Sequence, residues 1–378
     1  MKILVAPSSF KESLNSCDIA NYIRTGLQKA SKKFDITELP LADGGTGTAY
    51  ILTRAIDGQF IKCRVTGPLN KGVEATYGIV PQQKLAIIEL AEAAGLRLVP
   101  QKKRNPLVTT TQGVGELIVD AVQRGYKKII VGIGDSATID CGVGALSVLG
   151  IRFLDKQNHE IEPTCRGLIA LKKIDISGLY QGMKNVRIIV AADVNNVLTG
   201  KKGALMYAEQ KGARAKMMSI IQKALRNFRK VVLHQFNVDV DGIPGSGAAG
   251  GIGGAMKVIL NAEIMSGFGI VQEIVFLEDE IKKADVVITG EGRIDKQTFY
   301  GKSTKKVVDI AHRYNKPVIL IAGSVTKDAK HFYKYGVIRQ YSIVQLAASP
   351  RTAMKQAPQL LKKVSYRVGK DIRNSLLS

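Results

Sequence analysis

Apolar runs that alternate with helical stretches are the feature that most restricts the fold of this chain. The run KILVAP (2–7) precedes a stretch of helical periodicity over residues 11–30, which Ser8 or Ser9 is placed to cap, and then the run DITELPL (35–41). The C-terminal part repeats this pattern with the apolar runs ADVVITGEG (284–292), PVILIAGS (317–324) and QYSIVQLA (340–347). Strands and helices that alternate in this way form a parallel sheet with helices on its faces.

The middle of the chain has a different order of predicted strands and helices. Three strand-like runs follow one another without a helix between them: QFIKCRVTGP (59–68), GVEATYGIV (72–80) and LAIIELA (85–91). They are followed by a helical stretch (113–125), strand-like runs (127–134 and 186–194) and one long helical stretch (212–236). We therefore predict an α/β protein in which residues 1–45 and 282–378 form a Rossmann-like parallel-sheet domain. Residues 46–281 form a second, mixed α/β domain inserted into it.

Length and charge limit the classes of function. A chain of 378 residues favours two domains over one. No apolar run reaches the length of a membrane span, and the first one is too short for a secretory signal, so we expect a cytoplasmic protein without a membrane partner. The formal net charge of +23 would suit a polyanion, but the lysines fall in scattered pairs without an aromatic platform. We therefore expect no nucleic-acid partner.

Polar and glycine-rich clusters follow the predicted strands repeatedly. They are Ser8-Ser9-Phe10-Lys11, Asp43-Gly44-Gly45, Gly134-Asp135-Ser136, Asp193-Val194-Asn195-Asn196, Gly290 to Asp295, and Gly323-Ser324. In open α/β sheets, ligands bind beyond the carboxyl ends of the strands. One such cluster would be an ordinary turn, but their repetition predicts a binding site at these strand ends.

Two glycine motifs resemble nucleotide-binding loops without matching them fully. GSGAAG (245–250) fits G-x-G-x-x-G, but Pro244 interrupts the strand that a dinucleotide site needs, so a close-packed helix start is the better interpretation. Such a helix start would still suit a phosphate. GKS (301–303) lacks the earlier glycine of a P-loop because position 296 is Lys. Lys302 could contact a phosphate or begin a solvated helix.

Three aspartates and two cations suggest phosphoryl transfer. Asp43, Asp193 and Asp295 each follow a predicted strand, where a single Asp is most often a turn or cap residue. Magnesium-assisted phosphoryl transfer needs carboxylates for the metal and one to orient or deprotonate a hydroxyl. Lys11 and Arg293 would hold the anionic groups. No G-x-S-x-G elbow or Ser/His/Asp set is present, which argues against acyl hydrolysis.

Taken in order, the motifs resemble those of the bacterial two-domain glycerate kinases (glycerate 2-kinases). The matching segments are APSSFKESL, LADGGTGTA, VTGPL, RNPLVTTTQGVGELI, GIGDSATIDCGVGALSVLG, ADVNNVLTGKKGA, EQKGA, PGSGAAGGIGGA, ITGEGRIDKQTFYGK and PVILIAGSV. The resemblance implies phosphorylation of D-glycerate by ATP with Mg²⁺, giving 2-phosphoglycerate, in a cleft between the two domains. It also allows a homodimer.

The resemblance carries expected roles to particular residues. Asp193 is expected to be the catalytic base, Lys11 and Arg293 to bind anionic groups during catalysis, and Asp295 and Asp43 to hold the metal. Substrate or nucleotide binding is expected at Ser9, Phe10, Asp43, Gly44, Gly45, Ser136, Asn196, Gly290, Glu291, Gly301 and Lys302.

The chain departs from the family motifs at several positions. Ser8 replaces an Asp, Thr46 replaces a Glu and Ile139 replaces an Asn of the usual motifs, whereas Asp135 and Cys141 stand in place of glycines and Val197 in place of a Pro. Two carboxylates and one amide are therefore lost, and one carboxylate is gained. These changes leave open a relative that acts on another small hydroxy acid, or that binds a small anion or nucleotide without turnover.

Overall fold

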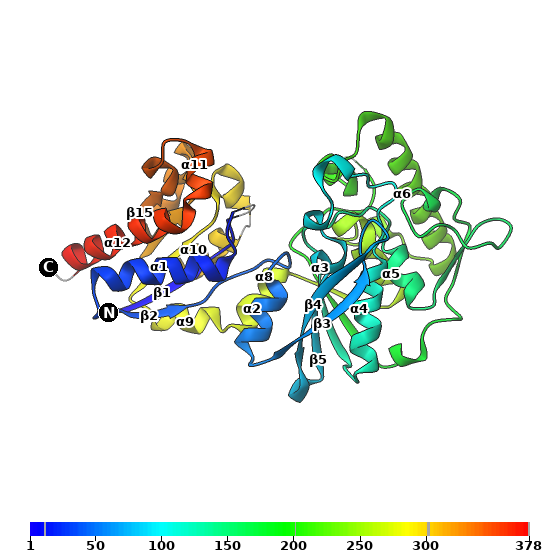
Figure 1. Ribbon diagram of the computed structural model, residues 1–378, viewed down its shortest axis with the longest axis horizontal. Helices are drawn as coiled ribbons and strands as arrows, with labels where there is room; N and C mark the ends of the chain where they lie inside the picture. The colour runs from blue at the N-terminus through cyan, green and yellow to red at the C-terminus, as the bar shows by residue number, and fades with distance from the viewer. Residues whose placement is uncertain (11–12, 201, 301–302, 377–378) are drawn as a thin grey trace. The chain divides into compact units, whose positions relative to one another are not determined.

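The computed structural model describes residues 1–10, 13–200, 202–300 and 303–376, which divide into two compact units. The first unit combines Met1–Ala42 with Val271–Ser378, and the second unit is Asp43–Ile270. The two ends of the chain therefore fold together, and one continuous segment between them forms the second unit (Figure 1).

The first unit is built on a five-stranded sheet in the order β15-β13-β11-β1-β2, and all of its neighbouring strands are parallel. Its strands are β1 (Lys2–Pro7), β2 (Asp35–Glu38), β11 (Val286–Gly290), β13 (Val318–Ala322) and β15 (Val337–Ser342). β11 and β13 are buried along their whole length, which explains their predominantly apolar sequences. The predicted parallel α/β sheet is confirmed.

Helices cover this sheet: α1 (Ser16–Ala30), α9 (Leu277–Lys283), α10 (Ser303–Arg313), α11 (Pro350–Lys355) and α12 (Ala357–Leu376), with α8 (Gly267–Ile274) at the unit boundary. α1 and α12 lie side by side (Figure 1). A Cβ at Gly26 would lie 2.5 Å from the Lys362 carbonyl oxygen, so glycine permits this close approach.

Two boundaries predicted in the first unit are wrong. α1 begins at Ser16, because the Asn15 side chain accepts a 2.8 Å hydrogen bond from the Asp18 N–H and caps the helix. Neither Ser8 nor Ser9 is its cap. The last strand, expected at residues 340–347, begins at Val337 and ends at Ser342, since Gly336 in the left-handed region turns the chain directly into it.

The second unit is built on a six-stranded mixed sheet in the order β10-β9-β6-β5-β4-β3. Its strands are β3 (Gln59–Thr66), β4 (Gly72–Val80), β5 (Leu85–Glu89), β6 (Lys128–Gly132), β9 (Arg187–Ala191) and β10 (Glu263–Met265). β3, β4 and β5 pair antiparallel, as three consecutive strands do, and β5, β6, β9 and β10 pair parallel. The predicted mixed α/β architecture of this part is confirmed.

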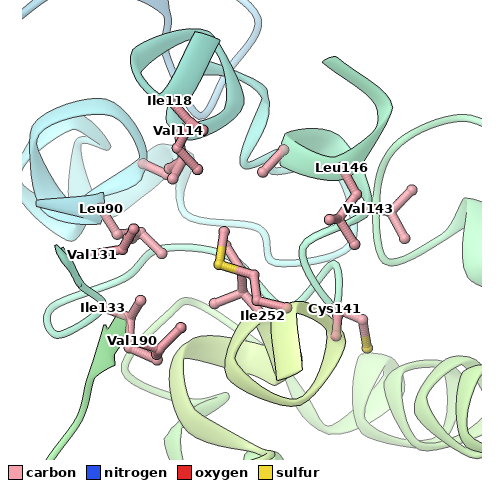
Figure 2. Close-up of a cluster of buried hydrophobic side chains, with 14 of the residues drawn as sticks. Leu90, Val114, Ile118, Val131, Ile133, Cys141, Val143, Leu146, Val190 and Ile252 are labelled. Carbon is pink, nitrogen blue, oxygen red and sulfur yellow. The ribbon is translucent and has the colours of Figure 1, made fainter. Parts of the chain in front are cut away.

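The remaining elements of this unit are α2 (Thr48–Ala55), α3 (Leu90–Ala94), α4 (Gln112–Gln123), α5 (Val143–Val148), α6 (Ala215–Phe236) and α7 (Ile252–Ile259), with the hairpin of β7 (Arg152–Leu154) and β8 (Lys173–Asp175). In the first unit, β12 (Arg293–Ile294) pairs with β14 (Ser324–Val325). Apolar side chains from β6, β9, α4, α5 and α7 meet in one buried cluster (Figure 2). No helix in the described ranges is long and apolar enough to cross a membrane.

The glycine-rich stretch 245–251 is a packed turn before α7. A Cβ at Gly250, whose φ is 75°, would lie 2.3 Å from the Thr138 carbonyl oxygen. A 3₁₀ turn at Val240–Gly242 precedes the stretch, where a dinucleotide fingerprint would have a strand. The glycines therefore let the start of α7 pack closely, which is the interpretation that the sequence favoured.

Candidate active site

In the second unit, the loop Asp43–Gly47 lies across the carboxyl ends of two parallel strands. The Gly44 carbonyl oxygen accepts a 3.0 Å hydrogen bond from the Gly134 N–H, just after β6. A Cβ at Gly44, whose φ is 89°, would lie 2.7 Å from the Ala191 carbonyl oxygen at the end of β9. The glycines are thus buried against the sheet while the Asp43 side chain remains exposed.

Asp193 stands at the same end of β9, and both of its carboxylate oxygens are held. Oδ1 accepts a 2.6 Å hydrogen bond from the Ser266 hydroxyl, and Oδ2 accepts a 3.1 Å bond from the Phe268 N–H. Between these two residues, a Cβ at Gly267 would lie 2.5 Å from the Asp43 carbonyl oxygen. The structure therefore brings Asp43 and Asp193 to one edge of the second sheet, where both side chains are exposed.

Ser136, a predicted binding residue, is buried and hydrogen-bonded to Lys211. The Lys211 ammonium donates 2.8 Å hydrogen bonds to the Ser136 hydroxyl and to the Thr138 carbonyl oxygen, although only 4% of the residue is exposed. Burial lowers the pKa of Lys211 to about 7, against the attraction of Asp140. Buried lysines with a lowered pKa concentrate at functional sites, and no local sequence pattern marks Lys211 as one of them.

Asp140 fixes the other end of the same loop. Its carboxylate is fully buried and accepts hydrogen bonds from the Thr111 N–H and hydroxyl at 2.9 and 2.7 Å, and from the N–H groups of Gly142 and Gly144. Burial raises the pKa of Asp140, and these bonds act in the opposite direction. Residues 136–140 are therefore held by buried polar groups at both ends.

Glu89, at the end of β5, caps the helix that follows the Asp43 loop. Its Oε1 accepts a 2.7 Å hydrogen bond from the Ala49 N–H, and the Gly47 N–H also bonds to the carboxylate. A carboxylate at this position is favoured by the dipole of α2. Burial nevertheless raises the pKa of Glu89 to about 7, since only 4% of the residue is exposed.

We expect Glu89→Gln to change how stability depends on pH. Because its pKa is raised, folded Glu89 keeps its proton between about pH 4.5 and 7, whereas the carboxyl of the unfolded chain loses it. The folded state therefore binds more protons than the unfolded state, and the wild type loses stability as pH rises through this window. The unfolding free energy of the wild type minus that of the variant should fall by about 3 kcal/mol across it. Urea unfolding at pH 5, 6, 7 and 8 measures this difference, and a constant difference contradicts the assignment.

Asn196, predicted to bind substrate or nucleotide, carries a buried amide. Neither its oxygen nor its nitrogen has a hydrogen-bond partner within the described part of the chain. Its backbone carbonyl accepts a 3.0 Å bond from the Gly247 N–H, which fixes the residue beside the packed glycine turn. Buried amides are normally satisfied, so this one is suited to a water or a ligand.

In the first unit, the ends of β1 and β11 lie together. The Ser8 N–H donates a 2.8 Å hydrogen bond to the Gly290 carbonyl oxygen, and a Cβ at Gly290 would overlap the Ile321 carbonyl group. Ser9 is half-buried next to this contact. Phe10 is only 3% exposed and packs in the core of the unit, which favours a packing role for its side chain over substrate contact.

The GEGRID segment turns back on the same sheet edge. The Gly323 N–H donates to the carbonyl oxygen of Glu291 at 3.3 Å, so the segment lies against the end of β13. The exposed Arg293 guanidinium stands 3.2 Å from the Asp295 carboxylate, which is only 20% exposed. One cation and one carboxylate of the predicted site are thus paired here.

The predicted site residues fall into two groups, one in each unit. The second unit holds Asp43, Gly44, Gly45, Ser136, Asp193 and Asn196, and the first unit holds Ser9, Phe10, Gly290, Glu291, Arg293 and Asp295. Lys11, Gly301 and Lys302 lie outside the described residues. Within the described ranges, no three His, Cys, Asp or Glu side chains gather closely enough to form a metal site by themselves.

Comparison with known proteins identifies relatives along the full length of the chain. The model of the glycerate kinase family matches residues 3–373. The glycerate kinase of Bacillus subtilis (strain 168) is 41% identical over 99% of this chain and 98% of its own. The glycerate 2-kinase of Escherichia coli (strain K12) is 43% identical, with 91% of each chain covered. A crystal structure assigned as a glycerate kinase 2 from Salmonella typhimurium LT2 covers 100% of both chains with a TM-score of 0.84 and 40% identity.

Proposed function

Because this chain belongs to the glycerate kinase family, whose members are kinases that phosphorylate an alcohol group, we propose that it makes 2-phosphoglycerate from D-glycerate with ATP and Mg²⁺. In this reaction the 2-hydroxyl oxygen forms a bond to the γ-phosphorus, and the bond from that phosphorus to the β,γ-bridging oxygen breaks, which releases ADP. The observation that carries the proposal is the geometry of Asp193, an exposed carboxylate fixed at a strand end.

Asp193 is the proposed base. Its two oxygens are oriented by the Ser266 hydroxyl and the Phe268 N–H, yet its side chain remains exposed to an incoming hydroxyl. In phosphoryl transfer, a carboxylate of this kind orients the attacking hydroxyl and accepts its proton. Because these bonds already order the side chain, no further conformational entropy of Asp193 is lost when the substrate binds.

Mg²⁺, bound together with a nucleotide, is the metal ion that we propose for this reaction. Mg²⁺ is usually held by one or two carboxylates, with waters and substrate phosphates completing its octahedron. Asp43, on the glycine loop, and Asp295, beside Arg293, are the carboxylates that we assign to it. When bound, the ion would neutralise charge on the transferring phosphoryl group.

The remaining residues are assigned to anion and substrate binding. Arg293, Lys11 and Lys302 would neutralise phosphate charge. The buried amide of Asn196 has hydrogen-bonding capacity available for a substrate or a bridging water. Ser9, Phe10, Gly44, Gly45, Ser136, Gly290, Glu291 and Gly301 complete the proposed binding residues, through backbone groups where the side chain is absent or buried.

The test is ATP turnover by the purified full chain with D-glycerate and Mg²⁺, against a blank without glycerate, with NMR identification of the product. We expect glycerate-dependent ADP release and 2-phosphoglycerate. Turnover with a different hydroxy acid alone would instead identify a redirected family member. ATP binding without turnover of any hydroxy acid would identify a non-catalytic relative, which is the outcome that the changes at Ser8, Thr46 and Ile139 would favour.

A further inference from the structure

Asp135 fixes the glycine loop of the second unit from the neighbouring strand end. Its Oδ2 accepts two hydrogen bonds from Thr46, one from the N–H at 3.1 Å and one from the hydroxyl at 2.8 Å. Asp135 follows β6 with a φ of 56°, a left-handed conformation that is uncommon for residues other than glycine. A single carboxylate thus reaches from the sheet to the middle of the loop that carries Asp43.

The sequence of the loop favours backbone freedom around Thr46. Gly44, Gly45 and Gly47 surround Thr46, and glycine leaves the backbone more freedom than any other residue. Gly47 has a φ of 97° and no heavy atom within 4 Å of the position that a Cβ would take. Hydrogen bonds to an ionised acceptor are stronger than neutral ones, so the Asp135 carboxylate is well suited to hold this segment.

Asp135 also lies close to the carboxylate of Asp43. A Cβ built on Gly45 would lie 3.1 Å from the Asp135 Oδ2 and 3.4 Å from the Asp43 Oδ1, so these two oxygens face the same small space. Asp135 and Thr46 are moreover two of the positions at which this chain departs from the motifs that it resembles, where Gly and Glu would stand. Position 46, where one of the two carboxylates is lost, is therefore in direct contact with Asp135, the carboxylate that is gained.

We propose that Asp135 is a positioning residue of the kinase reaction, which holds the Asp43 loop through Thr46 and supplies from the strand end the carboxylate that the loop lacks. This inference rests on the proposed function only for its catalytic consequence. Its structural part, the immobilisation of the loop, can be measured separately. Thr46 and Asp135 then form one unit, in which either residue has its effect through the other.

The first experiment compares Asp135→Ala, Thr46→Val and the double variant by kcat/KM and by hydrogen–deuterium exchange of the amides of residues 44–47. We expect Asp135→Ala to lower kcat/KM about 10- to 100-fold, because a displaced catalytic loop loses its alignment. It should raise amide exchange about tenfold. The double variant should be no worse than Asp135→Ala. Additive losses contradict the coupling.

Asp57→Ala is the matched control, since Asp57 is exposed in the same unit with a φ of 51° and lies outside the proposed site. It carries the same backbone strain, so equal losses in both Ala variants would overturn the proposal.

The relocation of the carboxylate from position 46 to position 135 is tested by Thr46→Glu combined with Asp135→Gly. We expect this pair to recover most of the activity that Asp135→Gly alone loses, and no recovery overturns the relocation. A wild type inactive on glycerate refutes the proposed function, while the exchange data still decide whether Asp135 immobilises the loop.

Discussion

Asp193→Asn is expected to lower kcat for glycerate phosphorylation by about 10²- to 10⁴-fold, because the variant loses the proton acceptor. The amide can keep the hydrogen bonds with Ser266 and Phe268, with its oxygen accepting from the Phe268 N–H and its nitrogen donating to the Ser266 hydroxyl. Shape and packing are therefore preserved while basicity is removed. Steady-state kinetics with saturating ATP measure the loss, and KM for ATP should change little.

Asp175→Asn provides a matched control for this variant. The Asp175 carboxylate also accepts hydrogen bonds from a serine hydroxyl and a backbone N–H, both of Ser177, at 2.7 and 3.0 Å, but it lies on the β7–β8 hairpin. We expect its kcat to stay within about twofold of the wild type, as for a surface change remote from the site. A kcat for Asp193→Asn within about threefold of the wild type would show that Asp193 is not the base.

Much of the fold could be predicted from the sequence because the strands and helices that define it have recognisable local patterns. β1, β11 and β13 are predominantly apolar runs, which is typical of strands buried on both faces. The polar clusters after the strands were informative for the same reason, since the carboxyl ends of parallel strands share one edge of a sheet. Asp43 and Asp193 are an example: they are far apart in the chain, and the structure brings their backbone segments together through Gly267.

Contacts between distant residues were beyond the reach of local patterns. Lys211 is one of 55 lysines and arginines, and nothing in its neighbourhood reveals that it is buried against Ser136, 75 positions away. Glu89 ends an apolar run, and a lone acid in such a run was the available signal for a buried carboxylate. The helix cap was predicted wrongly for a related reason. Asn15 and Ser8 are both residue types that cap helices well, and only tertiary contacts decide where α1 begins.

Lys211→Met is expected to remove a large pH dependence of stability on the alkaline side. The folded pKa of about 7 lies below the value near 10.4 of an unfolded lysine, so between these values the unfolded chain binds more protons. The unfolding free energy of the wild type therefore receives a contribution from Lys211 that rises with pH above about 7, and the full cost of the buried charge is present below it. The wild type minus variant difference should rise by about 2 kcal/mol between pH 7 and 9.

Urea unfolding of both proteins at half-unit pH steps measures this difference, in which the titration of Asp140 and of all other shared groups largely cancels. Lys216→Met is the control for the removal of a lysine, because Lys216 is exposed on the same unit in α6. If the difference between the wild type and Lys211→Met does not change with pH, Lys211 is charged at pH 9 in the folded protein, and its hydrogen bonds to Ser136 and Thr138 then hold a permanent cation in the core of the second unit.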